Sequence, residues 1–424
     1  MTRYCVIGAG PAGLATLKTM LDEGHDVDCF EKSDAIGGHW NHDYDALHLI
    51  TSRDVTGYEG FPMPQEYPLF PHRDHMLDYF HRFADAFDLK GRITFNTAVE
   101  SVVPLPTDGP IGSAGWRVTI SDGAVRDYDG VLVANGHLWD PKIPDIPGEF
   151  TGTQVHSGSY RNTGDIDGKR VLVIGSGNSG CDLAVDAAQQ HFDTHIVIRR
   201  GHFFQPKTFF GRPRSELAFL TEFTPEEQDL IARLMMRLKV GTHDDYPGMP
   251  EPDHGTLAEG PPIVNDLLLY WIQHGRITVR PGIERFDGHT VHFADGTSDE
   301  FDTILWATGF HASLPFLDES LLQRRDGIPL RVGAAVVPLD LEKLYLIGMI
   351  GARGPQPPIY PIQAQIAAKM IAMHESSAGG FRPLAGPLTS SQEHEWRIDI
   401  LRHIWLEQVD RTHDALRLLS HVPA

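Results

Sequence analysis

The sequence predicts an α/β fold, and a glycine pattern that occurs twice is the main reason. GAGPAG stands at residues 8–13 and GSGNSG at residues 175–180. Each follows an apolar run typical of a buried parallel strand, at residues 4–7 and 171–174, and each opens an alanine-rich helical pattern. This order of strand, glycine turn and helix begins a Rossmann-like unit. At 424 residues the chain is too long for one average core, so two Rossmann-like domains are expected.

The three glycines of the pattern have different tasks. The first permits a tight turn, the second lets the backbone approach a pyrophosphate, and the third lets the helix pack closely on the strand. The pyrophosphate then lies on free amides at the helix N-terminus. A single match can be an ordinary glycine turn, but two matches in this context indicate two dinucleotides. The residues expected to bind them are Gly8, Gly10, Pro11, Ala12 and Gly13 in the first loop and Gly175, Gly177, Asn178, Ser179 and Gly180 in the second.

The strands that follow the two loops distinguish the two ligands. Residues 26–30 are expected to form the next strand of the first unit, and Glu31 at its end can accept hydrogen bonds from the ribose of FAD or NAD. Residues 194–198 take the same place in the second unit but end in Arg199 and Arg200, which suit a 2′-phosphate. The second ligand is therefore predicted to be NADPH. Solvated surface charge remains the alternative for the acid and for both arginines.

Composition excludes several classes of protein. With 36 basic and 57 acidic residues the net charge is −21, which argues against a nucleic-acid partner. Three cysteines form no CxxC pair, so a flavoprotein of the disulfide-reductase type is excluded and buried thiols in a reducing cytoplasm are expected. No signal peptide or run of about 20 apolar residues predicts a membrane segment. Histidine pairs such as His72 and His75 lack a third ligand at a typical interval, so no metal site is expected.

The order of the motifs predicts that the first domain is discontinuous in sequence. Residues 1–150 would form its first part, residues 151–309 the second domain, and residues 310–424 the completion of the first. The apolar run at residues 344–352, read as one strand before a helix start, is the reason for this return. A helical insertion is expected at about residues 203–262.

Inside this insertion, Thr224 is expected to cap a helix with an acidic first turn. Met235 and Met236 have helical spacing to other apolar residues, which favours packing over a cofactor contact. The polar, proline-rich residues 244–255 are predicted to be a mobile loop.

At four further motifs the chain resembles the class B flavin-dependent monooxygenases, the flavin-containing monooxygenase family. FxGxxxHxxxY is present as FTGTQVHSGSY at residues 150–160, and GGxW, FPMP and ATGF stand at residues 37–40, 61–64 and 307–310. The resemblance implies FAD in the first domain and NADPH in the second. It also implies that His156 couples the linker to nucleotide binding and domain motion, although a buried hydrogen-bonding histidine fits equally well. The further cofactor residues implied are Gly38, Trp40, Thr308, Gly309 and Gln365.

Two of these assignments have ordinary alternatives. Trp40 is either a wall of the flavin pocket or part of the core. Gln365 either reaches back to the flavin from the start of a late helix or is an exposed glutamine.

The chain departs from the family pattern in two places. The related Baeyer–Villiger enzymes end the long motif in tryptophan, whereas Tyr160 stands here, which favours oxygenation of a heteroatom. The family usually has an asparagine ahead of FPMP that holds nicotinamide and the flavin peroxide, and the register puts Ile50 there. Thr51, Ser52 or Arg53 must then supply the polar contacts, or the peroxide is shorter-lived. Ser52 and Arg53, together with the linker histidine, are the predicted catalytic residues.

The resemblance implies a monooxygenase in which NADPH reduces FAD and dioxygen then forms a 4a-hydroperoxyflavin. A soft nitrogen or sulfur nucleophile of a small molecule attacks the distal oxygen, so no protein nucleophile is needed. The protein must exclude water and stray proton donors. Alternatives are Baeyer–Villiger oxygenation of a ketone, an NADPH oxidase that produces hydrogen peroxide, and a sensor without turnover. The expected partners are a small-molecule substrate and dioxygen, and a homodimer is left open.

Overall fold

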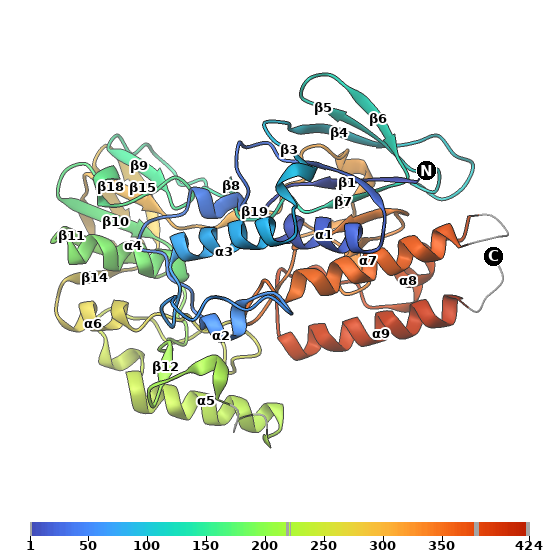
Figure 1. The fold of residues 1–424 in the computed structure, drawn as a ribbon. Helices are drawn as coiled ribbons and strands as arrows, with labels where there is room; N and C mark the ends of the chain where they lie inside the picture. Colours follow the sequence, from blue (N-terminus) through green and yellow to red (C-terminus); the bar gives the residue numbers. More distant parts are fainter. Residues whose placement is uncertain (1, 218–219, 221, 377–380, 421–424) are drawn as a thin grey trace.

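Two parallel five-stranded sheets organise the chain (Figure 1). A computed structural model describes residues 2–217, 220, 222–376 and 381–420. The sheet orders are β24-β7-β1-β2-β3 and β14-β11-β10-β18-β9, and neighbouring strands are parallel throughout. The strands are β1 (Arg3–Ile7), β2 (Asp26–Phe30), β3 (Ile93–Thr94), β7 (Gly130–Val133) and β24 (Leu344–Leu346) in the first sheet, and β9 (Thr153–His156), β10 (Arg170–Ile174), β11 (Asp193–Val197), β14 (Ile277–Arg280) and β18 (Thr303–Trp306) in the second. The expected α/β fold with two parallel sheets is confirmed.

Each sheet is entered through a strand, a glycine loop and a helix. Helix α1 (Pro11–Asp22) joins β1 to β2, and helix α4 (Asn178–Gln189) joins β10 to β11. Pro11 occupies the first position of α1, where its fixed φ suits the helix and its missing N–H costs no hydrogen bond. The two predicted starting strands and the two helices after them are therefore present.

Side chains of the first sheet alternate between two cores. On β1, Tyr4 and Val6 belong to a cluster that contains residues of the helices, whereas Cys5 and Ile7 belong to one that contains residues of a small antiparallel sheet. The sheet is thus buried on both faces, as a parallel sheet requires. The covering elements are α3 (Arg73–Ala86), α7 (Ile359–Glu375), α8 (Ala385–Ser391) and α9 (Arg402–Ser420) on the first side and β4 (Val99–Pro104), β5 (Trp116–Ile120) and β6 (Val125–Tyr128) on the second.

The second sheet repeats this arrangement. On β10, Val171 and Val173 share a cluster with α4 and α6 (Leu267–Gln273). Leu172 and Ile174 pack on the other side. That side is covered by the antiparallel strands β15 (Ile283–Asp287), β16 (Thr290–Phe293) and β17 (Ser298–Glu300).

Late residues of the chain return to the first sheet. Leu344 of β24 pairs with Val131 of β7, in a sheet otherwise built from residues 3–133. The run at residues 344–352 is not one strand, however. Gly348 has φ +80 and turns the chain, so β24 ends and β25 (Gly351–Ala352) pairs instead with β26 (Asp399–Ile400).

Two short strands pair with each other where the chain passes between the two sheets. Strand β8 (Asp140–Pro141) pairs antiparallel with β19 (Phe310–His311), so the outgoing and returning segments form one ribbon. The remaining short elements are α2 (Arg53–Thr56), β20 (Arg324–Arg325), β21 (Ile328–Pro329), β22 (Arg331–Val332) and β23 (Val337–Pro338).

The insertion forms a hairpin of β12 (Thr208–Phe209) and β13 (Arg212–Pro213), followed by α5 (Pro225–Val240). The predicted cap at Thr224 is confirmed, because its hydroxyl accepts from the amide of Glu227 in a capping box. Met235 and Met236 are buried as expected. The stretch predicted to be a mobile loop contains two buried side chains, Tyr246 and Met249, which pack into the core beside α4.

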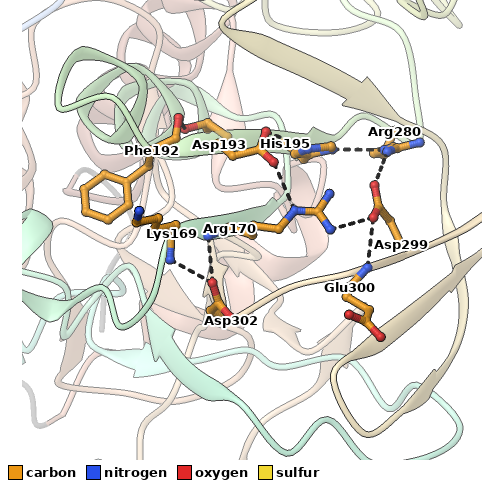
Figure 2. Close-up of polar contacts among 10 residues, drawn as sticks. Lys169, Arg170, Phe192, Asp193, His195, Arg280, Asp299, Glu300 and Asp302 are labelled. Atoms are coloured by element: carbon orange, nitrogen blue, oxygen red, sulfur yellow. Dashed lines mark hydrogen bonds and ion pairs between the residues drawn. The ribbon is translucent and has the colours of Figure 1, made fainter.

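A ring of polar side chains connects the starts of β10 and β11 with the end of β14 and with β17 (Figure 2). Arg170 contacts Asp193 at 3.0 Å and Asp299 at 2.7 Å, and Arg280 contacts the other oxygen of Asp299 at 2.5 Å. The Nε of Arg280 donates to Nδ1 of His195 at 3.0 Å, which leaves Nε2 of His195 to face Asp193 at 3.2 Å. Two acids balance two arginines here. Arg170 and Asp193 start their strands, whereas the glycine loop at residues 175–180 follows the carboxyl end of β10.

Three features of composition can be compared with the structure. Cys5, Cys29 and Cys181 are free and buried, as expected. Among the described residues no helix has the length and apolar character needed to cross a bilayer. In the same part of the chain, no three histidine, cysteine or acidic side chains are grouped as metal ligands.

Candidate cofactor and catalytic site

The first glycine loop is shaped by close backbone contacts. Gly8 has φ +100, and a Cβ there would lie 2.7 Å from the carbonyl oxygen of Ala134. A Cβ on Gly13 would lie 1.9 Å from the carbonyl oxygen of Gly8. At Gly10 the nearest atom to a Cβ would be the Cα of Gly38, at 3.7 Å. The first and third glycines are therefore required by packing, and the second is not.

The second glycine loop has the same geometry. Gly175 has φ +111, with a Cβ position 2.4 Å from the carbonyl oxygen of Ala307. A Cβ on Gly180 would again lie 1.9 Å from a glycine carbonyl, that of Gly175. Around Gly177 the described residues place no atom within 4 Å of the Cβ position, apart from its chain neighbours. Since packing does not require this glycine, the open space fits the close approach of a ligand.

The helices after both loops begin without a side-chain cap. Gly10 precedes α1 and Gly177 precedes α4, and both are extended residues that offer no capping oxygen. The first amides of such a helix need an acceptor, and a pyrophosphate is a suitable one. Both loops therefore fit a dinucleotide.

Glu31 lies beside the first loop in the predicted position at the end of β2. Its carboxylate is buried and accepts from the amide of Ala9 at 2.7 Å. The other oxygen accepts from the amide and the hydroxyl of Ser33, at 2.9 and 2.8 Å. These bonds fix the carboxylate at the strand end, and its unused lone pairs can still accept from a ribose.

Arg199 and Arg200 follow β11 and are both exposed. Among the described residues Arg199 forms no ion pair, and Arg200 has only a distant one, 4.0 Å from Asp253. Both guanidinium groups are therefore available to a phosphate next to the second loop.

His156 connects the two segments that pass between the sheets. Its Nδ1 accepts from the amide of Gly158 at 3.1 Å, so the proton is on Nε2, which donates to the carbonyl oxygen of Gly309 at 3.1 Å. Burial lowers the pKa of His156, which favours this neutral form. Thr308 takes part as well, because its hydroxyl donates to the carbonyl of Lys142. The predicted residues His156, Thr308 and Gly309 thus lie together.

Gly38 and Trp40 lie near the first loop but have different surroundings. Gly38 has φ +60, and a Cβ there would come within 3.3 Å of the Cα of Gly10. Trp40 is partly buried against the first core, with its ring 6.1 Å from that of Phe80. The backbone contact brings the GGxW motif to the loop, while the indole also serves the core.

Neither side chain predicted to be catalytic in the 50–53 segment is free. Ser52 is fully buried and donates to the carboxylate of Glu216 in the insertion. The guanidinium of Arg53 donates to the carbonyl of Tyr67 at 2.7 Å and to Gln65 at 3.3 Å. These bonds hold Arg53 to its own segment, and its catalytic role stays a prediction. Thr51 is likewise bonded within the segment, to Thr56 at 2.8 Å.

The late helix presents a different glutamine from the predicted one. Gln365 is exposed. Gln363 is fully buried, accepts from the amide of Gly348 at 2.9 Å and donates to the carbonyl of Ala334 at 3.2 Å. Gln363 and Gln365 stand two residues apart and therefore lie on different sides of the helix, and only the burial of α7 distinguishes them.

A contact between the two domains was not predicted from the sequence. Asp182 of α4 accepts from the hydroxyl of Tyr44 at 3.0 Å and from the amide of Asn265 at 2.8 Å. Burial raises the pKa of Asp182 to about 6. The sequence offered one signal that Asp182 lies near the second loop. Asp182 follows the loop residue Asn178 by four positions and therefore shares its helix face.

Comparison with known proteins agrees with these motifs. A family model described as flavin-binding monooxygenase-like matches residues 1–376. The chain is 31% identical over 396 residues to dimethylaniline monooxygenase [N-oxide-forming] 2 of Oryctolagus cuniculus, covering 87% of this chain and 73% of that protein. It is 34% identical over 394 residues to flavin-containing monooxygenase 5 of the same species, covering 86% and 72%.

Solved structures of similar fold support the architecture. A flavin-containing monooxygenase from Stenotrophomonas maltophilia has a TM-score of 0.67 at 22% identity, over 88% of this chain and 99% of that one. Cyclohexanone monooxygenase in an open crystal structure has a TM-score of 0.71 at 18% identity, over 98% and 99%. At such identities the likeness concerns the fold. The family model and the curated relatives go further, and they show that the chain belongs to the flavin-containing monooxygenase family of class B flavin monooxygenases.

Proposed function

We propose that the protein is an NADPH- and FAD-dependent monooxygenase that oxygenates a soft nitrogen or sulfur atom of a small molecule. The observation that supports this most directly is the pair of equivalent glycine loops with opposite charges beside them. Glu31 stands next to the first loop, and Arg199 and Arg200 follow the strand after the second. The acid suits the ribose of FAD and the arginines suit the 2′-phosphate of NADPH. Family membership by itself implies a flavin and a nicotinamide cofactor.

In this proposal the domains divide as the motifs suggest. Residues 1–150 and 310–424 would hold FAD, and residues 151–309 would hold NADPH. Bound FAD would supply the activation of dioxygen once NADPH has reduced it. The residues proposed for FAD are Gly8, Gly10, Pro11, Ala12, Gly13, Glu31, Gly38 and Trp40, and those for NADPH are Gly175, Gly177, Asn178, Ser179, Gly180, Arg199 and Arg200.

The protein's own part in the reaction would be to position the cofactors and to exclude water. Tyr44 and Asp182 hold the two domains against each other beside the second loop. His156 and Gly309 connect the segments that cross between the domains. Since a soft nucleophile needs no activation by a base, no acid–base pair is required at the reacting atom. The three buried thiols suit a reducing compartment, and we propose a cytoplasmic location.

One observation favours a second candidate, an NADPH oxidase. Thr51, Ser52 and Arg53 were expected to replace the family's asparagine, but their side chains are bonded to other parts of the protein. Without a polar contact from this segment, activated oxygen would be released as hydrogen peroxide before a substrate could react.

Stopped-flow spectroscopy separates the two candidates. The FAD-loaded protein is reduced with NADPH without oxygen and is then mixed with oxygenated buffer. A distinct transient flavin spectrum between those of the reduced and oxidised forms would support the monooxygenase. N,N-dimethylaniline or a thioether should then shorten the lifetime of this intermediate. Direct return to oxidised flavin with one hydrogen peroxide per NADPH, unchanged by any amine, thioether or ketone, would establish the oxidase instead.

A further inference from the structure

The hairpin of the insertion places two cations directly opposite each other. Thr208 pairs with Pro213, and the amide of Arg214 donates to the carbonyl of Lys207 at 3.0 Å. Lys207 and Arg214 are therefore cross-strand neighbours, and their side chains leave the hairpin on the same face. Like charges in this arrangement repel each other and destabilise a hairpin. The pair needs an anion to balance it.

Arg214 has no such anion within the described part of the chain. Its guanidinium forms no hydrogen bond or ion pair there, and its Nε is buried without a partner. Burial lowers the pKa of Arg214 to about 10, and no acidic group opposes this effect. Arg214 is half-buried, and the hydration lost at its Nε is not replaced by a protein partner, which is costly.

The charge of Lys207 is only partly balanced by nearby acidic side chains. Burial lowers the pKa of Lys207, and the charges of Asp182 and Asp266 act against that effect. Its ammonium group lies 5.7 Å from the centre of the Phe70 ring, which belongs to the first domain. No acid opposes the effect of burial at Arg214, so Arg214 is the member of the cation pair that lacks a counter-charge.

The cation pair lies against the segment where the reaction is expected. Glu216, two residues after Arg214, accepts from Ser52, and Lys207 contacts Phe70. Figure 1 shows β12 beside α2, the helix that begins at Arg53. The pair therefore lies between residues 50–53 of the first domain and α4 of the second, where Asp182 acts on the charge of Lys207.

We propose that Lys207 and Arg214 bind a carboxylate of the substrate, so that the protein acts on acidic thioethers or amines. This rests on the proposed function and adds the substrate class to it. A guanidinium binds a carboxylate through two parallel hydrogen bonds, and an ammonium group beside it adds charge. The need for local cations is large, because a net charge of −21 repels an anionic substrate from the protein as a whole.

Ligand-dependent melting of the FAD-loaded protein, saturated with NADP⁺, tests this without turnover. The probes are 3-(methylthio)propionate and its neutral amide. We expect the carboxylate to raise Tm of the wild type and the amide to leave it unchanged. In Arg214→Met the carboxylate should bind about tenfold more weakly or not at all, since a charge-assisted pair is lost. Without ligand this variant should melt at or above the wild-type temperature, because a half-buried charge without a partner has been removed.

Arg212→Met is the matched control, since Arg212 is exposed on the same hairpin and loses the same charge. It should keep the carboxylate response. The proposal is wrong if the wild type shows no carboxylate-dependent shift, if Arg212→Met weakens binding as much as Arg214→Met, or if NADP⁺ suppresses the response, which would assign the cations to the dinucleotide. Because melting reports binding alone, a failure of oxygenation would overturn the proposed function and leave this result standing.

Discussion

The imidazole of His156 donates to the carbonyl oxygen of Gly309, 153 residues further along the chain, at 3.1 Å. Its other nitrogen accepts from the amide of Gly158, and the same carbonyl of Gly309 accepts from the amide of Lys142 at 3.0 Å. One neutral side chain thus joins the end of β9 to both strands of the ribbon between the domains. Protonation would turn the accepting nitrogen into a donor that faces another donor.

The His156 contact predicts a specific dependence of stability on pH. Burial lowers the pKa of His156 below its ordinary value of 6.5, so the unfolded chain binds the proton more readily. The stabilisation is present above pH 6.5 and is lost as pH falls through the lower folded value. The Tm difference between the wild type and His156→Gln should therefore shrink on acidification. The exposed His311, varied to Gln, controls for general effects on the ribbon. A pH-independent difference would contradict the prediction.

Alanine variants of the third glycines should separate the two cofactor sites. Because a Cβ at Gly13 or Gly180 would lie 1.9 Å from a carbonyl oxygen, each variant must distort its loop. Gly13→Ala should lose FAD during purification, whereas Gly180→Ala should keep FAD and lose NADPH binding. Flavin absorbance and anaerobic reduction by NADPH measure both effects.

Gly177→Ala adds the same methyl group to the second loop without the steric clash expected in Gly180→Ala. Beyond its chain neighbours, no residue that the structure describes comes within 4 Å of its Cβ position, so the Tm of the variant should match the wild type. The KM for NADPH should still rise by about tenfold or more, because the added methyl group occupies the approach of the pyrophosphate. An unchanged KM would show that the pyrophosphate binds elsewhere.

Arg199 and Arg200 are expected to make the protein bind NADPH in preference to NADH. Replacing both by alanine should raise the KM for NADPH by roughly 10- to 100-fold and change that for NADH little, since only NADPH carries a 2′-phosphate. Both side chains are exposed, so the Tm should stay the same. Initial rates with the two cofactors give the comparison, and equal effects on both would remove the phosphate assignment.

Asp182 predicts the opposite pH dependence to His156. Its pKa is raised from 3.8 to about 6, so its contribution to stability is present below pH 3.8 and is lost as pH rises through about 6. Relative to the wild type, Asp182→Asn should become progressively more stable across this range, because the amide remains neutral. Melting curves of both proteins between these pH values are the measurement, and parallel profiles would contradict it.

Gln363 and Gln365 allow a comparison within one helix. Gln363→Leu leaves the amide of Gly348 without its acceptor, at a cost of about 1–3 kcal/mol, whereas the carbonyl of Ala334 still accepts from the indole of Trp405 at 3.1 Å. Gln365→Leu changes an exposed side chain and should cost under about 0.5 kcal/mol. Denaturant unfolding measures both, and equal losses would show that burial in α7 does not set the role of these glutamines.

The sequence by itself determined the features that depend on neighbouring residues. Both glycine loops, the acid at the end of β2, the arginines after β11 and the cap at Thr224 were predictable, because turns, strand ends and helix caps are decided by contacts within a few positions. The order of the motifs along the chain also identified the family.

Only the tertiary structure decided the features that depend on distant partners. Ser52 meets Glu216 across 164 positions and Tyr44 meets Asp182 across 138. The strand at residues 344–352 failed as a prediction because Gly348 turns the chain, and Gln363 rather than Gln365 is buried because of what packs on α7. Burial and pairing belong to the packed chain. For the same reason, an ordinary arginine in the sequence, Arg214, became an unpaired cation only when the insertion folded against the first domain.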